Sequence, residues 1–170
     1  IKVNNARALR IDPAGNGTDN APNLIGGASN NYAGPAAVGA TIGGGGGWTF
    51  ANSRADSVLG IWSTVGGGAQ NTAEGPFSTV GGGVASRTSG NTATVGGGGL
   101  NVASGDYSTI GGGRENLTTR SNSTVGGGYL NQASGQSSVV PGGWDNRSDG
   151  DYSLAAGRRA RAAAHSRPAG

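Results

Sequence analysis

A six-residue motif that recurs at a fixed interval, once in every 15-residue unit, is the feature that most constrains this chain. The motif reads S-T-V-G-G-G, and it or a degenerate copy of it begins at Ser63, Ser78, Ala93, Ser108, Ser123, Ser138 and Ser153. The whole unit reads approximately x-x-S-T-V-G-G-G-x-x-N-x-A-x-G. Self-similarity at a fixed period is typical of folds in which each unit stacks on the next.

Composition excludes the other folds that a glycine-rich chain adopts. The 170 residues include 37 glycines and only 5% aromatic residues, so few bulky side chains are available for an ordinary globular core. The period differs from the three-residue period of collagen, and a fixed period argues against a disordered tract. The chain contains no Cys, which removes disulfides, thiolate metal sites and thiol nucleophiles.

Each unit contains two short segments compatible with β-structure, one around S-T-V-G and one around N-x-A, with glycine-rich corners between them. We therefore predict an all-β fold, a parallel β-solenoid in which one unit forms one coil; the repeat itself leaves the handedness open. The predicted core ladder is Val65, Val80, Val95, Ile110, Val125 and Val140, followed by Ala155. The second strand adds the inward-facing residues Ala73, Ala103 and Ala133.

The repeat divides the chain into three predicted segments. Residues 63–165 form seven 15-residue coils, and residues 166–170 form a tail. Residues 1–62 are irregular, and we expect them to cap the solenoid or to begin it with longer coils. The step from Ile42 to Val65 is longer than one unit, so a glycine-rich loop carrying Trp48, Phe50 and Trp62 is expected to project there.

The core of such a coil is thin. Burial of one valine contributes roughly 1.5 to 3 kcal/mol, whereas fixing the backbone of one residue costs about 1 to 2 kcal/mol. We therefore expect the glycine-rich surface to pack against other chains, which makes the protein a homo-oligomer.

The units resemble the head repeats of trimeric autotransporter adhesins, the YadA-like heads, which read approximately S-x-A-x-G-x-x-A-x-A-x-G. The last unit matches at Ser153, Ala155, Gly157, Ala160 and Ala162. In the preceding units the N-x-A pair comes one residue later. The chain is also similar to tail-fibre-like bacterial proteins that combine a K-V-N-x-x-R-A-L-R segment, an N-x-I-G-G segment and G-G-G-x-x-N repeats, here residues 2–10, residues 23–27 and the units above.

This resemblance implies a left-handed parallel β-roll with three chains around one axis. It also implies an extracellular location, on a cell surface or in a phage-like fibre. A fold analogy by itself does not establish a function.

Aromatic residues are the main candidates for binding. They fall in two columns, three residues before and four residues after the inward apolar position, and we place both columns at corners or on the outer face. The candidate ligand-binding residues are Trp62, Phe77, Tyr107, Tyr129, Trp144 and Tyr152. The second column also contains Arg114 and Arg159. Exposed rings beside polar residues bind glycans or protein receptors, and packing of the rings against neighbouring coils is the simpler alternative.

An asparagine column and a threonine column run along the same units. The asparagine column contains Asn71, Asn101, Asn116, Asn131 and Asn146, with Ser86 and Arg161 in the same register. Amide ladders at a turn account for it.

The threonine column, Thr64, Thr79, Thr94, Thr109 and Thr124, is expected to face outward at a spacing of about 4.8 Å. Such arrays suggest ice binding, but one column flanked by glycine favours a contact with a neighbouring chain.

Few residues support catalysis. His165 is the only histidine, and Glu74 and Glu115 are the only glutamates, with nothing that pairs them as an acid and a base. The glycine run at 43–47 lacks the Lys-Ser/Thr ending of a phosphate loop. We predict that the protein is not an enzyme and needs no cofactor.

Two oxygen-rich groups of side chains are candidate metal ligands. They are Asp12, Asn16 and Asp19, and Asp145, Asp149 and Asp151. Neither group has the layout of an EF-hand or of the calcium-binding nonapeptide, so we assign both to Asx turns and predict no metal site.

The net charge of +3 suggests no nucleic-acid partner, because four of the twelve basic residues gather near the end of the sequence as Arg158, Arg159, Arg161 and Arg167. No apolar stretch is long enough to cross a membrane, so we expect no insertion.

The leading functional hypothesis is an adhesive module of an extracellular fibre. The alternatives are a self-assembling filament subunit and, less favoured, an ice-binding solenoid.

Overall fold

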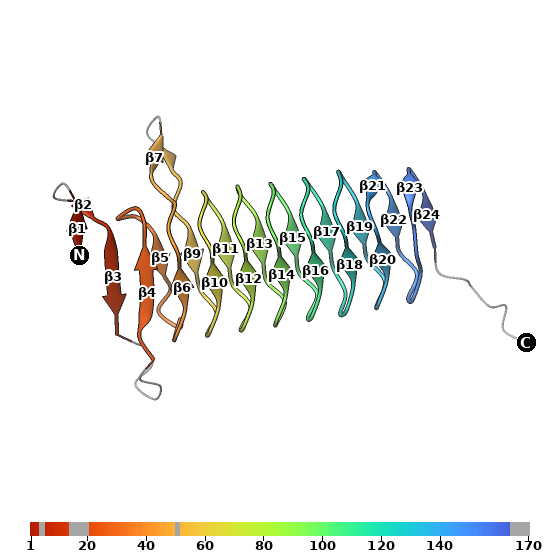
Figure 1. The fold of residues 1–170 in the computed structure, drawn as a ribbon. Helices are drawn as coiled ribbons and strands as arrows, with labels where there is room; N and C mark the ends of the chain where they lie inside the picture. The colour runs from red at the N-terminus through yellow and green to blue at the C-terminus, as the bar shows by residue number, and fades with distance from the viewer. Residues whose placement is uncertain (4–5, 14–20, 50–51, 164–170) are drawn as a thin grey trace, which may run out of the picture.

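The computed structural model describes residues 1–3, 6–13, 21–49 and 52–163. Regular structure in these residues consists of 24 short strands, and none of the described residues lies in a helix. No helix long and apolar enough to cross a membrane is therefore found in this part of the chain. The strands follow one another along a single axis as the turns of a flattened coil, with β1 and β24 toward opposite ends (Figure 1). The fold is a parallel β-solenoid.

Two nine-stranded sheets form the sides of the solenoid. The first sheet contains β3 (Leu9–Asp12), β4 (Asn23–Gly26), β6 (Thr41–Ile42), β10 (Thr64–Val65), β12 (Thr79–Val80), β14 (Thr94–Val95), β16 (Thr109–Ile110), β18 (Thr124–Val125) and β20 (Val139–Val140). The second sheet contains β5 (Tyr32–Ala33), β9 (Ser57–Val58), β11 (Thr72–Ala73), β13 (Arg87–Thr88), β15 (Val102–Ala103), β17 (Leu117–Thr118), β19 (Gln132–Ala133), β22 (Arg147–Ser148) and β24 (Arg161–Ala162).

Three pairs of strands stand outside these sheets. They are β1 (Lys2–Val3) with β2 (Ala6–Arg7), β7 (Trp48–Thr49) with β8 (Asn52–Ser53), and β21 (Gly143–Trp144) with β23 (Gly157–Arg158). The β7–β8 hairpin projects from the body of the solenoid between β6 and β9 (Figure 1). Trp48 lies in this projection, Phe50 lies outside the described residues, and Trp62 belongs instead to the coil that follows.

The strands pair in a parallel register that places equivalent residues opposite one another. In the first sheet Thr64 lies opposite Thr79, and Val65 lies opposite Val80. In the second sheet Thr72 lies opposite Arg87. The backbone hydrogen bonds therefore run along the axis, from each coil to the next.

The predicted core ladder lies inside. All six residues from Val65 to Val140 in that ladder are fully buried, as are Ala73, Ala103 and Ala133 on the opposite sheet. The second sheet also buries Thr88 and Thr118, which lie between these alanines, and Ser148, which follows Ala133; the sequence had not marked these three as core. Thr88 and Thr118 each donate a hydroxyl hydrogen bond of 2.9 Å across the core, to Ser78 and Ser108 respectively. Each of these serines directly precedes a strand of the first sheet. The core is therefore partly polar and internally paired.

The two sheets continue into the segment that was predicted to be irregular. Leu24 pairs with Thr41, and Thr41 pairs with Thr64, so both of these steps along the chain are longer than the step from Thr64 to Thr79. Ile25, Ile42 and Val58 extend the hydrophobic core into these longer coils.

One strand departs from the parallel arrangement of the first sheet. β3 pairs antiparallel with β4, with Asp12 opposite Asn23, because the chain reverses direction between these two residues. An antiparallel strand therefore covers this edge of the sheet.

The prediction of seven 15-residue coils is wrong at the last coil, although Leu154 still lies opposite Val139 in the expected register. Gly143 lies opposite Gly157 and Arg147 lies opposite Arg161, so this coil is one residue shorter than the coils before it. The cause is the S-L-A-A-G segment, whose corner is one residue shorter than that of S-V-V-P-G-G. Arg158, and not Arg159, consequently follows Trp144 in its column. Ala160 takes the place in the asparagine column that the unbroken period gives to Arg161.

Candidate functional site

Two corners join the sheets in each regular coil. The first corner, residues 60–63 and their equivalents, leads from the second sheet into the first. The second corner, residues 66–71 and their equivalents, leads back to the second sheet. Because the two sheets face each other across the core, these corners lie at opposite edges of the flattened coil.

Each corner contains a non-glycine residue with a positive φ. Tyr107 has φ 56° in a first corner, and Leu130 has φ 57° in a second corner. Bulky residues rarely adopt this conformation, which here is held by bonds to a neighbouring coil. The Tyr107 N–H donates to the Asn91 carbonyl at 2.8 Å, and the Leu130 N–H donates to the Arg114 carbonyl at 3.1 Å. Both side chains leave the coil at its edge and are exposed.

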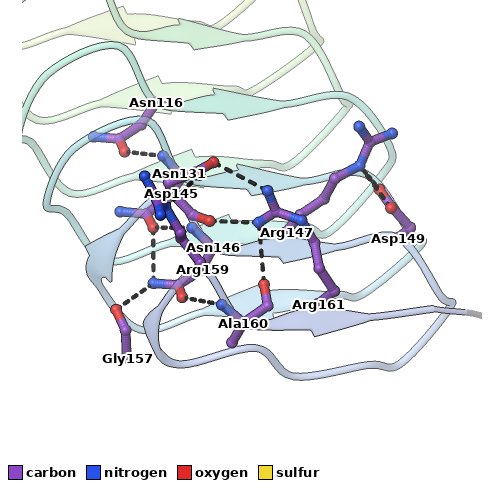
Figure 2. Close-up of polar contacts among 10 residues, drawn as sticks. All are labelled: Asn116, Asn131, Asp145, Asn146, Arg147, Asp149, Gly157, Arg159, Ala160 and Arg161. Atoms are coloured by element: carbon purple, nitrogen blue, oxygen red, sulfur yellow. Dashed lines mark hydrogen bonds and ion pairs between the residues drawn. The ribbon is translucent and has the colours of Figure 1, made fainter.

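The asparagine column anchors the second corner (Figure 2). The Asn131 side-chain amide donates to the carbonyls of Gly127 and Gly143, each at 2.9 Å. Its Oδ1 accepts the backbone N–H of Asn146 at 3.0 Å. These buried bonds fix the path of the corner in one coil relative to the next, and so they fix the positions of the side chains that the corner presents.

The same column extends further toward the N-terminus than the sequence indicated. Asp56 is fully buried in it, between Asn31 and Asn71, and its N–H donates to the Asn31 Oδ1 at 3.0 Å. Burial raises the pKa of the Asp56 carboxyl, although hydrogen bonds from Asn71 and from the backbone of Gly46 oppose this shift.

The six candidate aromatic residues do not form one surface. Trp62, Phe77, Tyr107 and Tyr152 occupy first corners, whereas Tyr129 and Trp144 occupy second corners at the opposite edge.

The four rings of the first corner are scattered along their edge. Trp62 and Phe77 belong to neighbouring coils, whereas Tyr107 and Tyr152 are isolated and are 60% and 77% exposed. The Trp62 ring lies against Gly39, where any Cβ would overlap it. Ring packing on a neighbouring coil therefore accounts for Trp62, and Tyr107 and Tyr152 present single exposed rings.

The second corner carries a compact group, which we call the arginine–aromatic ladder: Arg114, Tyr129, Trp144, Arg158 and Arg159. In the backbone pairing of successive coils, Arg114 lies opposite Tyr129, Tyr129 lies opposite Trp144, and Trp144 lies opposite Arg158. The Arg114 guanidinium lies 5.8 Å from the centroid of the Tyr129 ring. The guanidinium groups of Arg158 and Arg159 lie 4.3 and 4.7 Å from the Trp144 ring centroid. These are cation–π distances.

Two carboxylates, Glu115 and Asp145, form ion pairs with three of the arginines around this ladder. Arg114 pairs with Glu115 at 2.9 Å. Arg159 and Arg161 share Asp145, at 3.7 and 3.2 Å (Figure 2). In the described part of the chain, Arg158 has no ion-pair partner, and its guanidinium lies over the Trp144 ring. The sequence pointed to the aromatic members of this group, but it missed the contribution of Arg158 because the short last coil shifts the register by one residue.

The two glutamates considered for catalysis form ion pairs with arginines, and the histidine lies outside the described residues. Glu74 accepts two hydrogen bonds from Arg87, at 2.7 and 2.6 Å, and raises the pKa of that guanidinium. Glu115 pairs with Arg114, and His165 lies outside the described residues. Over the described ranges the surface encloses no cavity.

The candidate metal ligands are likewise engaged elsewhere. Asp12 pairs with Arg10 at 2.6 Å, and Asp149 pairs with Arg147 at 2.6 Å. Asp151 accepts the Gln136 N–H at 2.8 Å. Asn16 and Asp19 lie outside the described residues, and no group of three or more metal-ligating side chains occurs within them.

The threonine column forms an in-register row on the first sheet, as its spacing predicted. Its members are partly exposed, and Thr109 is exposed. Val139 continues the row beyond Thr124. The row remains a single column, which is narrower than the two-column face expected of an ice-binding surface.

The fold defines the chain as a β-solenoid repeat protein. No protein-family model matches it, and no curated protein sequence matches it.

Proposed function

We propose that this chain is a non-catalytic structural and adhesive module of an extracellular fibre, either on a cell surface or in a phage-like tail fibre. The observation that supports this best is the uninterrupted pairing of each coil with the next, from β4 to β24. Such a ladder makes a stiff rod, and the rod presents the same edge positions repeatedly along its length. Repeated weak contacts to a glycan or protein receptor then give avidity.

The functional form in this proposal is a homotrimer. Three left-handed rolls of 15-residue coils lie around one axis, as in the adhesin heads that the repeats resemble. The thin, partly polar core supports association, because each regular coil buries few apolar side chains, such as Val80 and Ala73. Contact between chains would supply further buried area.

Two measurements test the proposal. Light scattering coupled to gel filtration should give a mass three times the chain mass of 16.4 kDa, independent of concentration. Binding to an array of neutral and charged glycans and to a collagen-coated surface should fall about tenfold in the double variant Tyr129→Ala/Trp144→Ala. The control is Tyr152→Ala, which removes an exposed ring at the opposite edge. A stable monomer would contradict the trimer, and unchanged binding by a folded double variant would contradict the binding edge.

The alternative is a filament subunit, and one observation at the last coil favours it. Leu154 pairs with Val139 and yet is 63% exposed. An exposed apolar side chain in such a row can contact a second chain. Negative-stain microscopy without ligand distinguishes the two: long polymers support the filament, and discrete rods support the adhesive module.

A further inference from the structure

We propose that the arginine–aromatic ladder binds an acidic polysaccharide, and that Arg158, held on the Trp144 ring, receives a carboxylate or sulfate group of it. The inference rests on the proposed adhesive function and deepens it by naming the chemistry of the ligand. Four features of the edge support it: the state of the Trp144 ring, the free charge of Arg158, the spacing of the arginines, and the position of the neighbouring acids.

The Trp144 ring is not an open platform for a neutral sugar. Sugar rings stack on bare aromatic faces, but two guanidinium groups lie over Trp144, at 4.3 and 4.7 Å from its centroid. The ring itself is only partly exposed. The aromatic residue therefore orders the cations, and the groups it presents to a ligand are guanidinium N–H donors.

Among the described residues, Arg158 is the arginine of the ladder that has no carboxylate partner, and Arg159 shares its partner Asp145 with Arg161. Arg114 pairs with Glu115, and Arg159 pairs with Asp145. Arg158 is exposed and has no carboxylate partner within the described ranges, and residues 159–170 contain no Asp or Glu. A guanidinium stacked through its face keeps its in-plane donors free, and these donors match the two oxygens of a carboxylate or sulfate.

The arrangement suits a linear ligand that lies along the axis of the rod. Arg114 and Arg158 are three coil steps apart, which is about 14 Å at the usual strand spacing. A polysaccharide with acidic groups along its length would meet both ends of the ladder at once. A second, weaker anion contact at Arg114 requires that the ligand replace Glu115 as the partner of the Arg114 guanidinium. Exposed ion pairs are weak, so this replacement has a low cost in free energy.

The neighbouring acids favour a saccharide over a nucleic acid. Glu115 lies beside Arg114, and Asp145 lies beside Arg159 and Arg161, so acids interrupt the basic groups of this edge and leave no continuous basic track for a phosphate backbone. Asp106 and Asp151 lie at first corners, on the opposite edge. A polyanion is therefore directed to the second-corner edge.

The experiment measures the binding of the whole chain to four probes by calorimetry: heparin, polygalacturonate, neutral dextran and single-stranded DNA of similar length. Heparin or polygalacturonate should bind: binding of polygalacturonate shows that carboxylates suffice, whereas binding of heparin alone shows that sulfate is required. Arg158→Ala should weaken this binding about three- to tenfold, and raising the salt should weaken it further. Trp144→Leu, which keeps an apolar side chain but removes the platform, should have a similar effect. Arg120→Ala removes an exposed arginine from a first-corner edge and should leave binding unchanged.

Several results would overturn the inference. They are equal binding of dextran, tighter binding of DNA than of both polysaccharides, or equal losses in Arg158→Ala and Arg120→Ala, which would indicate non-specific charge attraction. Adhesion to the glycan array that persists in Arg158→Ala would reject this anion site and leave the adhesive module standing. Absence of binding to every array glycan and to collagen would reject the adhesive function itself.

Discussion

The Asp56 carboxylate accepts both the backbone N–H and the side-chain amide of Asn71 through one oxygen, Oδ1, at 2.8 and 3.1 Å. Asp56 thus places a titratable group where most of the following coils carry an asparagine. Its second oxygen is buried and has no hydrogen-bond partner among the described residues. In the asparagine coils the corresponding atom is a nitrogen that donates to glycine carbonyls, as Asn71 does to Gly67 and Gly83.

Asp56→Asn should therefore stabilise the protein, and the gain should depend on pH. Burial raises the pKa of the folded carboxyl above its unfolded value of about 3.9, so the folded state retains the proton more strongly. The wild type consequently loses stability relative to the variant as pH rises from about 4 through the folded pKa. We expect the variant to be more stable by about 1 to 3 kcal/mol at pH 7 and by little at pH 3.

Urea unfolding at pH 3, 5 and 7 measures this difference. Asp106→Asn is the control, because Asp106 is exposed and accepts one backbone N–H, that of Asn91. A gain for Asp56→Asn that stays constant with pH would show that the carboxyl does not titrate as described.

A second prediction concerns Ser86, which interrupts the asparagine column. Its hydroxyl accepts the Asn101 N–H at 3.4 Å, a long bond, and it makes no bond equivalent to the two glycine contacts of Asn101. Ser86→Asn should add about 1 kcal/mol of stability. The reverse change, Asn116→Ser, should cost about 2 to 4 kcal/mol, because it leaves the carbonyls of Gly112 and Gly128 without that donor. Chemical denaturation of both variants checks the pair, and stabilisation by Asn116→Ser would refute the role of the column.

A third prediction separates two adjacent glycines. A Cβ at Gly111 would overlap the carbonyl oxygen of Gly126 in the next coil, whereas a Cβ at Gly112 has nothing within 4 Å. Gly111→Ala should cost more than about 2 kcal/mol, and Gly112→Ala should change stability by less than about 0.5 kcal/mol. Thermal unfolding of the two variants provides the comparison. Equal effects would mean that coil spacing does not determine the need for glycine.

A fourth prediction tests the buried hydroxyl pairs of the core. Ser108→Ala should cost about 1 to 3 kcal/mol, because it leaves the Thr118 hydroxyl buried without its acceptor. The double variant Ser108→Ala/Thr118→Val should recover most of that loss, since both partners become apolar together. Ala93 and Ala103 occupy the equivalent positions in the neighbouring coil and are fully buried. A double-mutant cycle measures the coupling, and additive losses would show that the two hydroxyls act independently.

Much of the fold could be predicted because the inward-facing side chains recur with the same period as the paired strands. The spacing of Val65, Val80 and Val95 gives the strand, its register and its buried face together. Glycine corners and a parallel stack follow from the same period. The alternation of Ala103 with Thr118 on the second sheet was harder to recognise, since a threonine in a strand is ordinarily read as exposed, and here its hydroxyl is paired inside.

The errors occur where the coil length changes. Deletion of one corner residue after Leu154 moves Arg158 into the column of Trp144, and a degenerate motif does not reveal where the deletion lies. The signal that was available is the match of Ala160 and Ala162 to a shorter unit. Asp56 was missed for a different reason: it lies one full period before Asn71, but it is not an asparagine and it precedes the first S-T-V-G-G-G motif. The six aromatic residues were expected at corners or on the outer face; they lie at corners, and their division between two edges required the three-dimensional path.

The stacking of coils has a consequence for how such a chain changes over generations. Most contacts of a regular coil, such as the Thr79 pairing with Thr64 on one side and Thr94 on the other, involve the two adjacent coils. Duplication or loss of one complete unit in the gene therefore alters the reach of the molecule by a single stacking step and preserves the remaining contacts. Insertion or loss of a single residue instead shifts the positions that follow along an edge, as the short last coil does for Arg158. Length can thus be tuned in whole units, whereas the identity of the exposed edge is changed by single-residue insertions and deletions within a corner.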